Sequence, residues 1–219
     1  MKLYLLDTLE SGVYGIYKSK EKNEYPDENI NKCAQFNELI KNWETLSFTI
    51  CDKINNGKKF YDAISHNRGY YIVNKNTKEI IEKEYGELVQ FLPMNCCEKL
   101  NENFYLLYPI YSLDVLDVDK SECSFIEDSR VFTAIYKYVF AKNRKYLAIF
   151  KLKSGDFIYS RHVIVTDTFR DFIESNNITG FDFEEVFDFD KEWFLLEVGC
   201  DLQNDTALKS GLFTPSAGK

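Results

Sequence analysis

The stretch between residues 88 and 159 constrains the fold most, because Tyr, Phe, Val and Ile dominate it in short runs. Such residues suit the half-buried surface of a β-sheet. Only 7 alanines occur among the 219 residues of the chain, so long helices are disfavoured. The turn sequence Ser154-Gly155-Asp156 predicts a hairpin between two of the runs. The predicted strands are Leu88–Leu92, Phe104–Tyr108, Leu113–Val115, Val131–Phe140, Tyr146–Lys151 and Asp156–Tyr159.

Two further segments, 70–92 and 162–186, share the pattern of a short strand, a helix of about three turns and another strand. In the second segment, Thr166 can cap the helix with its side-chain oxygen, and Gly180 lies just past the helix end. A duplication would explain the likeness, and so would chance. A third helix is predicted over Glu28–Trp43 from its apolar spacing. The fold class is therefore α+β: a mixed, mostly antiparallel sheet with about three or four helices and two similar strand–helix–strand units.

Composition excludes several classes of protein. Lys and Arg number 27 against 35 Asp and Glu, and the formal net charge of −8 argues against binding to nucleic acid. The first residues are interrupted by Asp7 and Glu10, so no signal peptide is expected, and no apolar window is long enough to span a membrane. The six cysteines form no C-x-x-C pair. We therefore expect a cytoplasmic protein with reduced thiols.

No familiar catalytic motif occurs in the sequence. Nucleophile elbows, zinc-binding H-E-x-x-H, dinucleotide-binding and phosphate-binding loops are all missing. The two histidines, His66 and His162, are too far apart to form a ligand pair at helical spacing, and nothing pairs a cysteine with a base. The sequence thus predicts a protein that is not an enzyme and that needs no cofactor or metal.

Acidic residues gather in two windows instead, 114–128 and 181–192, each with six acids against one Lys. The first interpretation is a strand with one buried aromatic face and one solvated acidic face. A second is a Ca²⁺ or Mg²⁺ site, although neither window has EF-hand spacing. A third is a surface that binds a basic protein, since opposed charge speeds and orients association. The residues predicted to bind such a partner are Asp114, Asp117, Asp119, Asp182, Glu184, Glu185, Asp188 and Asp190.

Three short blocks in residues 70–190 carry a family resemblance through their order and spacing. They are Leu-Pro at 92–93, Leu-Asp-x-x-x-Ser at 116–121 and Thr-Gly-Phe-x-Phe at 179–183. In this order they resemble the bacterial immunity proteins of polymorphic toxin systems, the eleventh immunity family, first catalogued as an uncharacterised domain. Residues 1–69 offer no matching block. The pattern positions expected to preserve the fold are Leu116, Ser121, Gly180, Phe181 and Phe183.

The resemblance implies an antidote that binds a cognate toxin and blocks it, without catalytic residues of its own. It also implies a division into an N-terminal variable region packed on the core (1–69), an immunity-protein-like core (70–203) and a flexible tail (204–219). The alternatives are a small α+β hydrolase or transferase that uses clustered carboxylates as acid and base, or a scaffold module. The sequence leaves open the identity of the toxin, the contact surface and the oligomeric state.

Overall fold

The computed structural model describes residues 1–9, 13–17, 45–50, 61–65, 69–96, 102–126, 131–142 and 144–191. Within this part, strands dominate and two helices interrupt them. They are β1 (Lys2–Thr8), β2 (Val13–Tyr17), β3 (Leu46–Ile50), β4 (Ala63–Ser65), β5 (Tyr71–Asn74), α3 (Lys75–Tyr85), β6 (Val89–Cys96), β7 (Phe104–Pro109), β8 (Ser112–Leu113), β9 (Glu122–Phe125), β10 (Phe132–Lys137), β11 (Ile149–Ser154), β12 (Phe157–Thr166), α4 (Asp167–Ser175) and β13 (Phe181–Asp188).

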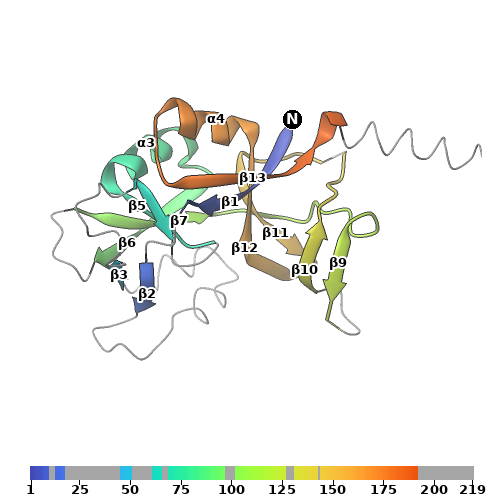
Figure 1. The fold of residues 1–219 in the computed structure, drawn as a ribbon, viewed down its shortest axis with the longest axis horizontal. Coiled ribbons are helices and arrows are strands. Elements are labelled where there is room, and N and C mark those ends of the chain that lie inside the picture. Colours follow the sequence, from blue (N-terminus) through green and yellow to red (C-terminus); the bar gives the residue numbers. More distant parts are fainter. Residues whose placement is uncertain are drawn as a thin grey trace, which may run out of the picture.

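The strands form three sheets (Figure 1). One has five strands in the order β13-β1-β12-β11-β8, one has six in the order β2-β3-β6-β7-β5-β4, and β9 pairs with β10 alone. The pairs β3–β6 and β8–β11 are parallel, and the other pairs are antiparallel. The α+β class, with mixed sheets and few helices, is confirmed. The prediction of one sheet is wrong, because so many twisted strands split into separate sheets rather than extend a single one.

Both predicted strand–helix–strand segments fold with that order of elements, as β5–α3–β6 and β12–α4–β13. Asn74 caps α3, since its Oδ1 accepts the N–H of Thr77 at 2.9 Å. Thr166 is the N-cap residue of α4, as predicted, but the expected side-chain capping bond is absent. Its hydroxyl lies 2.6 Å from the Thr168 hydroxyl, and Asp167 Oδ1 accepts the Thr168 N–H. A common origin of the two segments stays a prediction.

Strand β1 is the second strand of the five-stranded sheet, between the edge strand β13 and β12. Because its side chains alternate between the two faces, it contributes to two separate cores. Tyr4 and Leu6 join the core beneath α3 and α4, here called the helix-side core. Leu3 and Leu5 join the core beneath the β9–β10 hairpin, here called the hairpin-side core. Figure 1 shows the two helices together on one side of the molecule and the hairpin away from them.

Residues before position 70 thus supply strands to both larger sheets. The division into 1–69, 70–203 and 204–219 stays a prediction, and the expected helix at 28–43 and the tail lie outside the described residues. The hairpin predicted at Ser154-Gly155-Asp156 is confirmed between β11 and β12, with Gly155 at a φ of 56°. Among the helices described, none is long and apolar enough to cross a membrane.

Candidate functional site

The five-stranded sheet keeps the two acidic windows apart. Strand β13, which carries the second window, is one edge of the sheet. Strand β8, which directly precedes the first window, is the other edge. The predicted partner-binding residues therefore form two separate surfaces rather than one.

On β13, the pairing with β1 decides which face each acid occupies. Glu184 lies opposite Leu5 and Asp182 lies opposite Asp7, so these acids share the face of the hairpin-side core. The side chains of Asp182 and Glu184 are exposed, and Asp7 is half-buried. We call Asp7, Asp182 and Glu184 the β13 acid patch. Asp7 and Asp182 lie directly opposite each other, and such a pair of like charges is unfavourable in a sheet.

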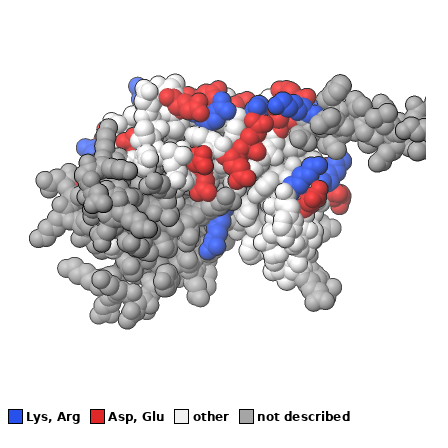
Figure 2. All heavy atoms as spheres, in the orientation of Figure 1, with Lys and Arg blue, Asp and Glu red and all other residues white. Residues whose placement is uncertain are grey.

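In the view of Figure 2, acidic atoms cross the middle of the molecule, over the band where Figure 1 draws β13. Asp7 is a member that the sequence prediction missed, because it lies outside both windows. Its place follows from the antiparallel register of β1 with β13, which joins residues far apart in the chain.

The other described acids of this window, Glu185, Asp188 and Asp190, make contacts within the molecule. A bulge at Leu3 and Tyr4 shifts the register, and Glu185 then lies opposite Tyr4, on the helix-side face. Glu185 Oε2 accepts a bond from Lys2 Nζ at 2.6 Å, and Asp190 Oδ2 lies 3.0 Å from the N-terminal amine of Met1. These two acids fix the start of the chain.

Asp188 is predicted to bind a partner, but its side chain is buried and not available for direct contact. Its Oδ2 lies 3.7 Å from Lys2 Nζ and 3.6 Å from Lys191 Nζ, and its Oδ1 accepts the N–H of Asp190. Burial alone would raise the pKa of the Asp188 carboxyl, but this hydrogen bond and the two lysines outweigh it and lower the pKa below its ordinary value. Asp188 therefore serves the structure of the strand end.

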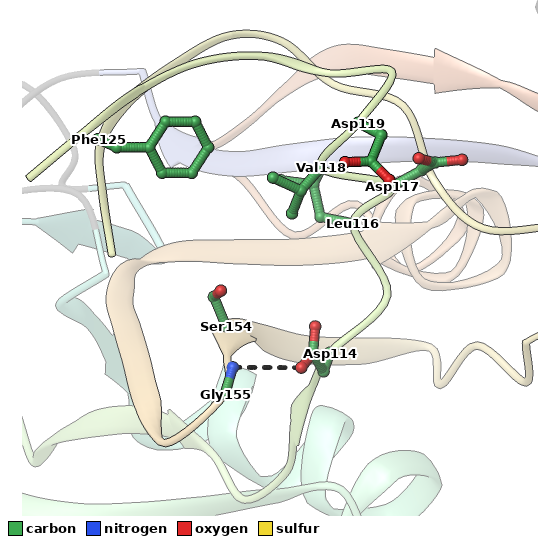
Figure 3. A pocket seen from close by; sticks show the side chains of 8 residues that line it. All are labelled: Asp114, Leu116, Asp117, Val118, Asp119, Phe125, Ser154 and Gly155. Carbon is green, nitrogen blue, oxygen red and sulfur yellow. Dashed lines mark hydrogen bonds between the residues drawn. The ribbon is translucent and has the colours of Figure 1, made fainter. Parts of the chain in front are cut away.

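The first window borders a cavity of about 590 Å³. Its lining residues are Asp114, Leu116, Asp117, Val118, Asp119, Phe125, Ser154 and Gly155 (Figure 3). Asp114 Oδ2 accepts the N–H of Gly155 at 3.2 Å, and Asp117 Oδ2 pairs with Lys120 Nζ at 3.0 Å. Asp119 is exposed. The alternative of a carboxylate acid–base pair is weakened, because a structural contact already occupies Asp114 and an ion pair occupies Asp117.

The pattern residues at 116–121 join this loop to the segment after β10. Leu116 is buried in the hairpin-side core and bridges to Phe140. Ser121 Oγ donates to Asp117 O at 2.7 Å and accepts the N–H of Val139 at 3.0 Å. These contacts hold the loop in place.

The pattern residues at 180–183 hold the start of β13. Gly180 has a φ of 100°, and a Cβ there would lie 2.1 Å from the backbone oxygen of Ala63, so only glycine fits. Phe181 is buried in the helix-side core. Phe183 packs edge-on against Tyr4, with ring centres 6.4 Å apart.

Two features escaped the sequence prediction. One is the set of exposed aromatic side chains beside the first acidic window, which includes Phe125, Tyr136 and Phe157. The other is Lys151, which is 4% exposed and lies in β11 with Nζ 3.6 Å from the centre of the Tyr108 ring. Burial lowers the pKa of Lys151 from its ordinary 10.5 to about 7. A lysine flanked by apolar residues in a strand was the available signal for its burial.

Among the residues that the structure describes, no group of three or more His, Cys, Asp or Glu side chains could hold a metal ion.

The sequence of the chain matches the model of one protein family over residues 13–188, and the family is described as an immunity protein family, Imm11. The match also covers residues 13–69, a region that contains none of the three short sequence blocks described above. Among curated proteins, none matches the chain.

Proposed function

The chain belongs to the Imm11 family of immunity proteins, and we propose that it neutralises a cognate toxin by binding it in a stoichiometric complex. The observation that carries the proposal is the match to this family over residues 13–188, most of the chain. Family membership suggests a role in toxin immunity that is not enzymatic. In the proposal, the protein acts in the cytoplasm and covers either the active site or the substrate-binding surface of a toxin that belongs to a polymorphic toxin system.

The β13 acid patch supports a basic partner. Its acids lie on one face of the sheet, on the edge strand β13 and on its neighbour β1, and the net charge of the whole chain is −8. A field of one sign raises the rate of encounter with a partner of the other sign, and added salt screens it. The patch would therefore steer a toxin with a basic surface toward this side of the molecule.

Co-expression with the toxin tests the proposal. A cell that makes the toxic domain encoded beside this gene should survive when this chain is also made, and the two proteins should co-purify. Cell death together with the absence of a complex would refute the proposal. The hydrolase or transferase alternative would protect at far fewer copies of this chain than of toxin, because an enzyme turns over.

Charge reversal tests the role of the β13 acid patch. The double substitution of Asp182 and Glu184 by Lys should slow association with the toxin about 10-fold or more at low salt. The matched control reverses Glu84 and Glu87, two exposed acids at the end of α3 and the turn after it. Equal association rates for both double variants would exclude the patch as the steering surface.

A further inference from the structure

The cavity beside the β9–β10 hairpin is lined by one aromatic side chain, Phe125. A second, Phe157, follows the lining residue Gly155 by two positions, and we call these two side chains the aromatic rim. Phe125 is 43% exposed and Phe157 is 48% exposed, which is unusual for side chains of this size. Phe125 lies opposite Phe132 across the hairpin, and the Phe132 ring stacks on Tyr159 with centres 3.7 Å apart. The Phe157 ring meets Tyr159 edge-on at 4.8 Å. The Phe157 ring thus contacts a buried aromatic stack directly, and Phe125 is tied to the same stack through the backbone pairing of its strand with Phe132.

The Tyr159 hydroxyl adds a further tie, since it accepts the N–H of Phe132 at 2.9 Å. A rim that is already ordered loses little entropy when a partner binds. Clusters of exposed aromatic side chains mark protein interfaces, and they dominate binding energy when they border a pocket. This rim therefore has the properties of an anchoring surface.

The lining of the same cavity is part apolar and part polar, and its charged side chains are all acidic. Asp117 is paired with Lys120, the one cation of the first window, so that charge is compensated. Asp114 uses one oxygen for the Gly155 N–H, and Figure 3 shows its other oxygen directed into the space below Phe125 and Val118. Asp119 is exposed, and its carboxylate lies beside Val118 in the same view. Figure 3 also shows the phenyl ring of Phe125 pointing across the cavity toward Val118.

An arginine side chain matches this combination of groups. Its guanidinium is planar, stacks on an aromatic ring and presents several donors in a fixed fork to carboxylate oxygens. A lysine ammonium can lie over a ring, but it has no planar face to stack on Phe125 and no fixed fork of donors for the carboxylates. A small free cation would leave the aromatic rim uncovered. Ile126, which follows Phe125 in the chain, is a further large apolar side chain that is exposed. A partner with an apolar surface around its cation would cover it.

Resting on the proposed function, we infer that this cavity is the docking site for an arginine of the toxin, held between Asp119 and Asp114 and stacked on Phe125. The net negative charge of the whole molecule, to which both acidic surfaces contribute, would then govern how fast the toxin arrives, and the cavity would govern how long it stays. A long-range field acts mainly on the association rate, whereas buried anchors act mainly on the dissociation rate.

The test measures binding kinetics of the full chain with the purified toxin domain encoded beside its gene. Phe125→Ser and Asp119→Asn should each raise the dissociation rate about 10-fold or more, with little change in the association rate. The control is Tyr136→Ser, which removes an aromatic side chain that is 72% exposed on the same hairpin but does not line the cavity. It should leave the dissociation rate within about 2-fold.

The outcomes separate this inference from the proposed function. If the wild-type chain binds the toxin and both cavity variants bind as well as Tyr136→Ser, the cavity is not the docking site while the proposed function stands. If the wild-type chain does not bind, the proposed function fails first. If Phe125→Ser fails to fold in a thermal melt, Asp119→Asn decides alone, because that side chain is exposed. Loss of a wild-type dimer in the cavity variants would assign the surface to self-association and overturn the inference.

Discussion

Replacing Lys151 by Met should stabilise the fold at neutral pH. The lysine is 4% exposed in β11, and the charge of its amine is offset mainly by the ring of Tyr108 at 3.6 Å. Burial lowers its pKa from 10.5 to about 7. That difference corresponds to a cost on the order of 4 kcal/mol for keeping the proton on the buried amine. The contact with Tyr108 offsets about 1–2 kcal/mol. The net gain expected from Met, which has a similar length and no charge, is therefore about 2–3 kcal/mol.

The sign of the pH dependence gives the sharper test. Between about pH 7 and pH 10.5 the unfolded chain holds a proton on Lys151 that the folded chain has released. Stability of the wild-type chain due to this residue therefore rises with pH across that window and is lowest at and below pH 7. The advantage of Lys151→Met should be largest near pH 6.5 and should shrink toward pH 10.

Urea unfolding of the wild-type and Lys151→Met chains at several pH values measures this advantage, since the free energy of unfolding extrapolates linearly from denaturant. Taking the difference between the two chains removes the contributions of all other titrating groups. Two results would refute this account of Lys151 as a buried amine whose charge is only partly compensated. One is a Met variant that is less stable than wild type at pH 7, and the other is a difference in free energy of unfolding that does not change with pH.

Two further substitutions test the loops that hold the acidic windows. Gly180→Ala should destabilise the fold by about 3 kcal/mol in urea unfolding, because its φ is 100° and a Cβ would overlap the Ala63 backbone oxygen. The matched control Gly155→Ala, at a φ of 56° with open space around the Cβ, should cost only about 1 kcal/mol, and equal costs would contradict the steric argument. Ser121→Ala should cost about 1–2 kcal/mol by removing the hydroxyl that joins Asp117 and Val139, and a loss below about 0.3 kcal/mol would argue against this role.

The strands and the hairpin turn could be predicted because their signals are local. Tyr, Phe, Val and Ile at successive positions favour extended backbone wherever the strand is placed, and Gly155 permits the turn that joins β11 to β12. The separation into three sheets could not be predicted in this way. It depends on pairings such as β3 with β6, which join segments far apart in the sequence and leave no local pattern.

In the candidate site, too, the local sequence pattern predicts the position of some acids, and strand pairing decides the position of the others. Alternation along β13 correctly places Asp182 and Glu184 on an exposed face opposite the buried Phe181. The same alternation fails at Asp188, because a bulge in the pairing with β1 changes the register and buries its side chain. The contribution of Asp7 also depends on that pairing.

The measurement that tests the central claim most directly is a titration of purified toxin with this chain while the activity of the toxin is followed. If the protein acts as a stoichiometric immunity protein, inhibition should grow linearly and be complete at one chain per toxin, and a complex of the two should elute together. Full inhibition at a small fraction of the toxin concentration would indicate catalysis, and undiminished toxin activity at a large excess of this chain would contradict neutralisation by binding.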